Sequence, residues 1–173
     1  MNGGVFMLSG LGRVTEILAS QLQIYTRLLE AAKNKRDQVI ANRVDLLEQT
    51  LQEEIELLSQ IEELEAERSV VMMSVCDALG IDPEEATLTL LAEKLPEDQS
   101  ARLLELRDSI LSTLDELSSL SQVNERLIRD SLRLINYSLG LYFPDDNDSI
   151  YDSGTSGGQL TKEKHKGLFD AKA

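Results

Sequence analysis

The sequence has few of the residues that build disulfides, aromatic cores or metal sites. Its 173 residues include one cysteine, one histidine, three prolines and no tryptophan, and only 4% of them are aromatic. The single cysteine, Cys76, excludes a disulfide within the chain, which fits a reducing compartment. Because strands are typically rich in aromatic and β-branched residues, this composition disfavours sheets. The chain is instead rich in Leu, Glu, Gln and Arg, which favour long helices.

Basic residues are also scarce relative to acidic ones. The chain carries 17 Lys and Arg against 31 Asp and Glu, which gives a formal net charge of -14. A protein with this charge repels a phosphate backbone, so we expect no nucleic-acid binding. No apolar run approaches the roughly 18 residues of a membrane span, and the first ten residues lack the basic start of a secretory signal. We therefore expect a soluble, cytoplasmic protein without membrane insertion.

Candidate metal sites in the sequence are incomplete. His165 is the only histidine, and no cluster has the spacing of zinc ligands. Segment 145–156 begins like a calcium-binding loop, but Ile150 stands where that loop requires Gly and Ser156 stands where it requires Glu. The interpretation we favour is a solvated acidic linker. We predict no metal site and no cofactor.

Catalytic motifs are missing as well. Cys76 lies in a helical pattern with no base in view, which is typical of a buried, inert thiol. The glycine-rich segment 154–158 lacks the Gly-Lys-Ser/Thr of a phosphate-binding loop. Carboxylates are dense between Asp45 and Arg68, but they alternate with apolar residues at helical spacing, as on a solvated outer face. We therefore predict no catalytic residues and no enzyme.

The first half of the sequence predicts two helices. Apolar residues recur every three or four positions from Leu11 to Ile40. After a weak stretch at 41–44, Asp45 and Glu48 form a capping-box pattern at the start of a second helix that reaches Leu79. One continuous helix is the alternative. The residues predicted to face inward are Leu11, Val14, Leu18, Leu22, Tyr25, Leu29, Ala32 and Val39 in the first helix and Leu47, Leu51, Ile55, Leu58, Ile61, Leu64, Val71 and Val75 in the second.

The second half predicts a short connector and a third long helix. Gly80 is the residue type that commonly ends a helix, and 82–85 combines a cap, a proline and acidic residues. These signals predict a short helix at 83–94 and a restart at Pro96, from which the helical pattern runs unbroken to Phe143. The expected fold is all-α: an elongated antiparallel bundle or coiled coil of three long helices with a short connecting helix.

The expected domain organisation is a helical domain followed by a tail. Residues 1–144 are expected to form the helical domain. After it the composition changes to Asp, Asn, Ser, Gly and Lys, which bury too little surface to offset the entropy lost on ordering. We therefore expect residues 145–173 to form a flexible polar tail, in which Leu160, Leu168 and Phe169 are the apolar exceptions.

The third predicted helix carries two apolar rows rather than one. The first row runs from Leu103 to Leu141 in alternating steps of three and four, which is the pattern of a coiled-coil seam. In this seam Leu127 and Leu134 are expected to point inward. The small polar residues that interrupt the seam are Asn124, Ser131 and Ser138.

The second row changes character along the helix. It is polar at Ser118, Ser121 and Glu125, and every later member is apolar. These later members either complete the core against both other helices or stay partly open to receive a partner's helix. An acidic chain with a spare apolar surface and no catalytic site is typical of a binding protein rather than a structural rod. We call these apolar members the C-terminal row; they are Ile128, Leu132, Ile135, Leu139 and Tyr142.

Six short patterns follow one another in a distinctive order and spacing. They are Leu28-Leu29-Glu30 with Lys35-Arg36; Glu53-Glu54 ahead of Leu57-Leu58; Ile61-Glu62-Glu63-Leu64-Glu65 with Arg68; Thr87-Leu88 with Leu91-Ala92; Asn124-Glu125-Arg126-Leu127-Ile128 with Ser131-Leu132; and Tyr151-Asp152 with Gly154. In this order the patterns resemble the FlgN family of flagellar export chaperones, over about Leu11 to Gly154. The apolar N-terminus and the segment 155–173 depart from that resemblance.

The resemblance implies a fold and a function. FlgN-type proteins are cytoplasmic, mostly helical chaperones. They bind the hook–filament junction proteins FlgK and FlgL before export and deliver them to the flagellar type III export apparatus. The resemblance also implies that client binding lies near 124–143, which contains the C-terminal row, and that a C-terminal tyrosine contacts the export gate. Tyr151 matches that tyrosine best, and Tyr142 is the alternative.

A self-associating coiled-coil protein is the rival interpretation of the same pattern. Such a protein would be favoured by an unbroken apolar seam, whereas Asn124, Ser131 and Ser138 interrupt this one. A second rival, an enzyme with a di-metal site between its helices, requires Glu-x-x-His pairs. None of the predicted helices contains a histidine.

Overall fold

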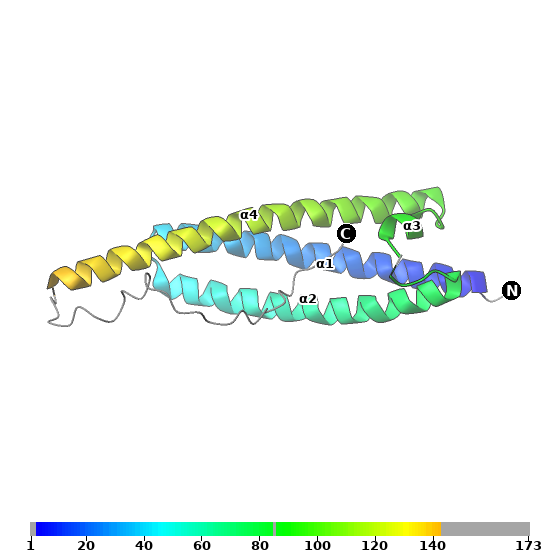
Figure 1. The fold of residues 1–173 in the computed structure, drawn as a ribbon, viewed down its shortest axis with the longest axis horizontal. Coiled ribbons are helices and arrows are strands. Elements are labelled where there is room, and N and C mark those ends of the chain that lie inside the picture. The colour runs from blue at the N-terminus through cyan, green and yellow to red at the C-terminus, as the bar shows by residue number, and fades with distance from the viewer. Residues whose placement is uncertain (1–2, 85, 143–173) are drawn as a thin grey trace, which may run out of the picture. The chain divides into compact units, whose positions relative to one another are not determined.

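The computed structural model describes residues 3–84 and 86–142, and this part of the chain is all-α (Figure 1). It is 89% helical and has no strand, which confirms the predicted fold class. The expected flexible tail, 145–173, lies outside the described residues. The helices are α1 (Gly3–Ile40), α2 (Val44–Leu79), α3 (Leu88–Ala92) and α4 (Glu97–Tyr142).

The chain divides into two compact units, Met1–Ser131 and Leu132–Ala173. The first unit holds α1, α2, α3 and the greater part of α4. The described part of the second unit is the last stretch of α4, 132–142. The predicted division into a domain at 1–144 and a tail at 145–173 stays a prediction.

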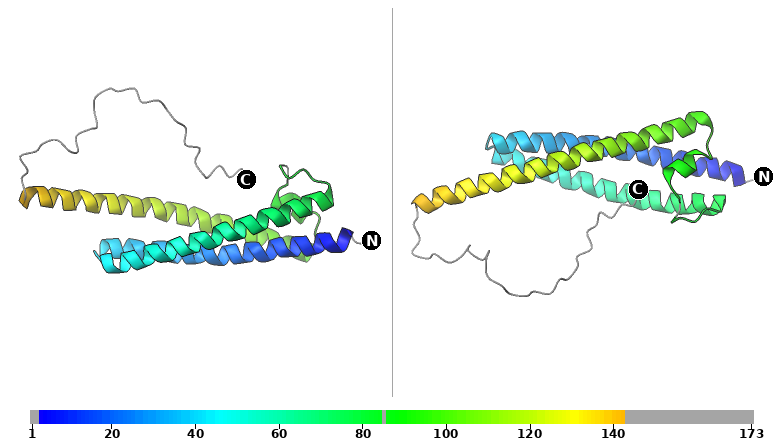
Figure 2. Two further views of the ribbon diagram at one scale, coloured as in Figure 1. Left: turned by 90° about the horizontal axis from the view of Figure 1, so that it is seen from below. Right: turned by 45° about the horizontal axis from the view of Figure 1, so that its top comes forward.

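Helices α1 and α2 lie side by side and antiparallel (Figure 2). The turn between them places Asn42 in the left-handed region, with φ 52°, which Asn tolerates better than most residues. The alternative of one continuous helix is therefore wrong. The predicted capping box is wrong too: the residue before α2 is Arg43, and no side chain caps the helix. Asp45 lies in the first turn, where its charge favours the positive end of the helix.

The connection from α2 to α4 is a turn and then a short helix. Gly80 ends α2 with φ 66°, as predicted. The predicted helix at 83–94 is too long, because the Asp82 carboxylate accepts from the Glu84 backbone N–H at 3.0 Å in a turn. The helix α3 begins later, where the Thr87 hydroxyl accepts from the Leu90 N–H at 3.1 Å.

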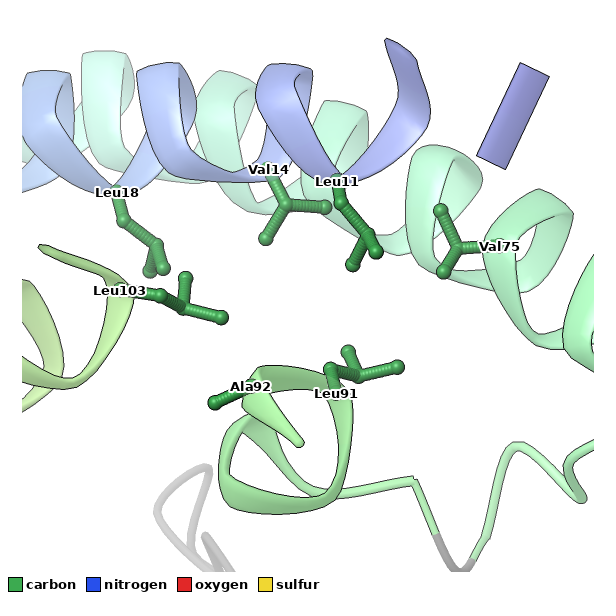
Figure 3. Close-up of a cluster of buried hydrophobic side chains, with 7 residues drawn as sticks. All are labelled: Leu11, Val14, Leu18, Val75, Leu91, Ala92 and Leu103. Carbon is green, nitrogen blue, oxygen red and sulfur yellow. The ribbon is translucent and has the colours of Figure 1, made fainter. Parts of the chain in front are cut away.

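The main core of the first unit gathers side chains from all four helices. Figure 3 shows the seven side chains converging on one another. They are Leu11, Val14 and Leu18 from α1, Val75 from α2, Leu91 and Ala92 from α3, and Leu103 from α4.

A second apolar cluster lies farther along the same unit. It is centred on the buried Leu28, Leu57 and Ile61, and Ile24, Tyr25 and Leu117 pack against it. Leu117 belongs to α4, so α4 contributes to this cluster as well as to the main core.

The inward face of α2 differs from the prediction in its first half. Leu51, Ile55 and Leu58 are exposed, although we predicted them to point inward. The inward positions there belong to a neighbouring row that contains Thr50 and Leu57. Thr50 accepts a hydrogen bond from the Gln38 amide at 2.9 Å, so a polar residue on this face is paired.

The inward face of α1 was predicted more accurately. Five of its predicted residues are buried, and Leu22, Tyr25 and Val39 are partly exposed. The helix also begins earlier than predicted, at Gly3. Its buried side chains that the periodicity missed are Ile17, Gln21, Leu28 and Ala31.

The corrected register of α2 can be tested with two adjacent leucines. Leu57 is 0% exposed and Leu58 is 52% exposed. We expect Leu57→Ala to lower the free energy of unfolding by about 2–5 kcal/mol, because it leaves a cavity in the second cluster. Leu58→Ala should change it by about 0.5 kcal/mol or less. Chemical denaturation of both variants measures the difference, and a larger loss for Leu58→Ala would contradict the register.

The close approach of α1 to α2 can be tested with two glycines. A Cβ at Gly10 would lie 2.7 Å from Cγ2 of the buried Val75, whereas a Cβ at Gly12 would meet nothing within 4 Å. We expect Gly10→Ala to destabilise the protein by about 1–3 kcal/mol through overpacking. Gly12→Ala should stabilise it by about 0.5–1 kcal/mol, because alanine favours helix. Thermal melting of both variants would refute the contact if Gly10→Ala were the more stable one.

Candidate functional site

The described residues show neither a cluster that could hold a metal ion nor an exposed thiol. No group of three or more His, Cys, Asp or Glu side chains in 3–84 and 86–142 is placed to hold a metal ion. Cys76 is buried, and burial, followed by the charges of Asp77 and Asp82, raises the pKa of its thiol. The burial of Cys76 agrees with the sequence analysis, and we expect a thiol in these surroundings to be inert. His165 and Tyr151 lie outside the described residues.

A polar network on α1 and α2 borders two hollows. The Gln21 amide donates to the Glu65 carboxylate at 2.9 Å, and Arg68 donates to the same carboxylate at 2.7 Å. Burial, and then the charge of Glu65, raises the pKa of the neighbouring Tyr25. Glu65 and Arg68 line two hollows, of about 170 Å³ and about 340 Å³, which lie below and at the lower end of the ~300–1,000 Å³ of typical ligand sites. This region is therefore better suited to holding helices together than to binding a small molecule.

Asn124 is the polar seam residue with a defined structural role. Its side chain is buried, and its amide nitrogen donates to the backbone carbonyl of Ala32 at 2.8 Å. The other amide atom, Oδ1, has no hydrogen-bond partner. A buried asparagine whose hydrogen bond forms in just one alignment of two helices fixes their register. It does so at a cost in stability. The Asn124–Ala32 contact therefore sets how α4 lies along α1.

The C-terminal row is largely open in the structure. Ile128 is partly buried, and Leu132, Ile135, Leu139 and Tyr142 are all at least half exposed. The helix beneath them provides a regular spacing of three and four residues, so the row forms one continuous stripe. Its geometry suits the packing of another helix. The role of the row in client binding stays a prediction.

One seam residue differs from the prediction. Leu134 was expected to point inward, but it is 66% exposed, whereas Leu127 is partly buried. The reason is the extent of the second unit, whose described part is a single stretch of helix and therefore has no second helix to cover an apolar face. Tyr137, which no predicted row contained, is 67% exposed. The sequence could have indicated this exposed residue, because Tyr137 is an aromatic residue on the polar side of the predicted helix.

No described helix has the length and apolar character needed to cross a membrane. The described residues thus form long helices with exposed apolar faces, and they include no cluster that could hold a metal ion. Exposed apolar faces of this kind can pack against a helix of another protein. The model of the family described as FlgN protein matches residues 7–156. The chain belongs to the FlgN family, whose general role is that of a flagellar export chaperone. Searches of the curated proteins and of the solved structures gave no match.

The state of Cys76 gives a test of the main core. Because the thiol is buried and its pKa is raised, we expect Ellman's reagent at neutral pH to leave it unmodified in the folded protein and to modify it fully in denaturant. The expected slowing is at least about 100-fold, since modification then requires local opening. Equal rates in both conditions would show that this end of α2 is open.

Proposed function

We propose that this chain is the chaperone of the hook–filament junction proteins FlgK and FlgL. It binds them in the cytoplasm before export and delivers them to the flagellar type III export apparatus. Membership of the FlgN family supports the general role. The proposed activity involves no catalysis, cofactor or nucleic acid. The net charge of -14 also disfavours a nucleic acid as partner.

The observation that carries this proposal is the exposed C-terminal row. Leu132, Ile135 and Leu139 are each at least half exposed, and together they form an apolar stripe that water solvates poorly. We infer that the row receives an amphipathic helix of the client, with Ile128 and Tyr142 at its ends. Such a contact would cover client surface that otherwise associates too early.

Delivery to the export gate is assigned to a different part of the chain. Tyr151 is the proposed contact, since it lies in the Tyr-Asp-x-Gly pattern of the resemblance. The family model also covers this position, because its match extends to residue 156. Client binding and gate contact are therefore proposed as separable functions.

Self-association through the α4 seam is the weaker alternative. The seam residue Asn124 donates its amide to Ala32 of the same chain, and Ser138 donates its hydroxyl to the Leu134 carbonyl within its own helix. Neither side chain therefore favours a matching partner helix. A helical rod would show concentration-dependent assembly, which sedimentation velocity detects.

Two carboxylate substitutions test the proposed client surface. We expect Leu132→Asp and Ile135→Asp to fold with nearly unchanged melting temperature, because both side chains are half exposed. Each should weaken FlgK and FlgL binding by about thirtyfold or more, since a charge would enter an apolar interface. Calorimetry and thermal melting of the same samples measure both effects.

Three controls accompany these variants. Leu111→Asp also alters a half-exposed apolar residue of α4, and it should leave both stability and client binding unchanged. Leu103→Asp places a charge in the main core and should unfold the protein. Tyr151→Ala should bind clients normally. If Leu132→Asp and Ile135→Asp fold and bind as the unaltered protein does, the client surface lies elsewhere.

A further inference from the structure

The first half of α2, cyan in Figure 1, carries an exposed apolar row that the client surface does not include. It follows alternating steps of four and three residues, which is the spacing of a coiled-coil seam. Neither apolar cluster of the first unit contains any of its members. We call this the α2 row; it consists of Val44, Glu48, Leu51, Ile55, Leu58 and Glu62.

The apolar members of the α2 row are open to solvent. Val44, Leu51, Ile55 and Leu58 are all exposed, and Ile55 reaches 60%. They follow a different row of α2 from Leu57, which occupies the second cluster. Single exposed leucines are ordinary, but four apolar side chains in one row over four turns make a stripe that another helix can pack against.

The acidic residues of this row have no ion-pair partner among the described residues. Glu48, Glu62 and the nearby Glu63 are exposed, and no described residue forms an ion pair with them. The acidic residues on the side of α2 that faces α1 behave differently. Glu53 pairs with Arg27 at 3.2 Å and Glu54 pairs with Lys35 at 2.6 Å. The negative charge along the α2 row is therefore available to a partner.

This combination specifies the chemistry of the occupant. We propose that the α2 row docks a basic amphipathic helix of another protein, whose apolar residues pack on Leu51, Ile55 and Leu58. Lysine or arginine beside them then pairs with Glu48 and Glu62. This surface is distinct from the C-terminal row, so either assignment can fail without the other.

Charge also disfavours the other occupants of such a row. In a parallel pairing of two copies Glu48 meets Glu48 and Glu62 meets Glu62, and in an antiparallel pairing centred on Ile55 Glu48 meets Glu62. Like charges that face one another across a seam are destabilising. An anionic lipid surface or a nucleic acid is repelled for the same reason. A basic helix gains from both the apolar and the charged residues.

The test uses two designed helical peptides of about three heptads, with leucine at both seam positions. One carries lysine beside the leucines, and the other carries glutamate. We expect the full-length protein to bind the lysine peptide at low salt at least about tenfold more tightly than the glutamate peptide. Fluorescence anisotropy measures both affinities, and added salt should weaken the binding.

Matched variants locate the binding site. The double variant Leu51→Ser with Ile55→Ser should lose at least about tenfold in affinity, whereas Val70→Ser with Met73→Ser, which alters two exposed residues of the same helix, should lose less than about twofold.

The charge is tested with pairs that change net charge equally. Glu48→Lys with Glu62→Lys should lose at least about tenfold in affinity. Glu93→Lys with Glu105→Lys, at exposed sites away from the row, should lose far less.

Three outcomes would overturn the proposal. The first is equal binding of both peptides, or equal losses in the row variants and their controls. The second is a dimer of the full-length protein that Leu51→Ser with Ile55→Ser abolishes, because the occupant is then a second copy. The third is a gain of more than about tenfold in peptide affinity when Lys162, Lys164 and Lys166 are replaced by glutamate in the full-length protein. The chain's own C-terminal segment would then be the occupant.

Discussion

The pairing of α1 with α2 is the contact on which the rest of the first unit depends. Among the four described helices it is the most extensive contact between any two. Gly10 lets the helices approach closely beside Val75 at one end, where α3 and α4 then add Leu91 and Leu103. Ion pairs such as Arg13–Glu67 at 2.6 Å run along the edge. Because each exposed ion pair contributes little, the apolar contact between the helices supplies most of the stability.

Buried polar residues of the first unit favour one alignment of its helices. Thr50, Gln21 and Asn124 are buried, and each has at least one hydrogen-bond partner. Each such residue occupies an inward position that a leucine would otherwise fill. Such residues lower the stability of the core but favour one alignment of the helices. In the first half of α2, Thr50 is buried whereas Leu51 and Ile55 lie on the exposed face.

The sequence was sufficient for the features that follow from local chemistry. Periodicity predicted three long helices, Gly80 marked the end of α2, and Pro96 marked the start of α4. It was insufficient where tertiary contacts decide between neighbouring rows of one helix. Two rows of α2 are each partly apolar, and periodicity favoured the one with Leu51. Only the positions of Gln38 and Lys35 on α1 show why the row with Thr50 faces inward.

Helix caps and exposed surfaces were also predicted incompletely from the sequence, because they too depend on the tertiary structure. Asp45 and Asp82 both have the residue type of a helix cap, yet the backbone path places one inside a helix and the other in a turn. For the C-terminal row, the sequence predicted the spacing of its members. Their exposure depends on whether another helix covers them, which the pattern of a single helix does not contain. Leu134 was misjudged for that reason.

The two exposed apolar rows differ in the charges beside them, and this difference matters for their partners. The α2 row contains Glu48 and Glu62 and has no cation paired with them in the described chain. The end of α4 instead carries Arg126, Arg129 and Arg133 on its polar side, and Arg129 forms an ion pair with Glu125. Apolar stripes of similar spacing attract many helices, so neighbouring charges decide which helix is accepted. We therefore expect a helix that matches one row to be a poor match for the other.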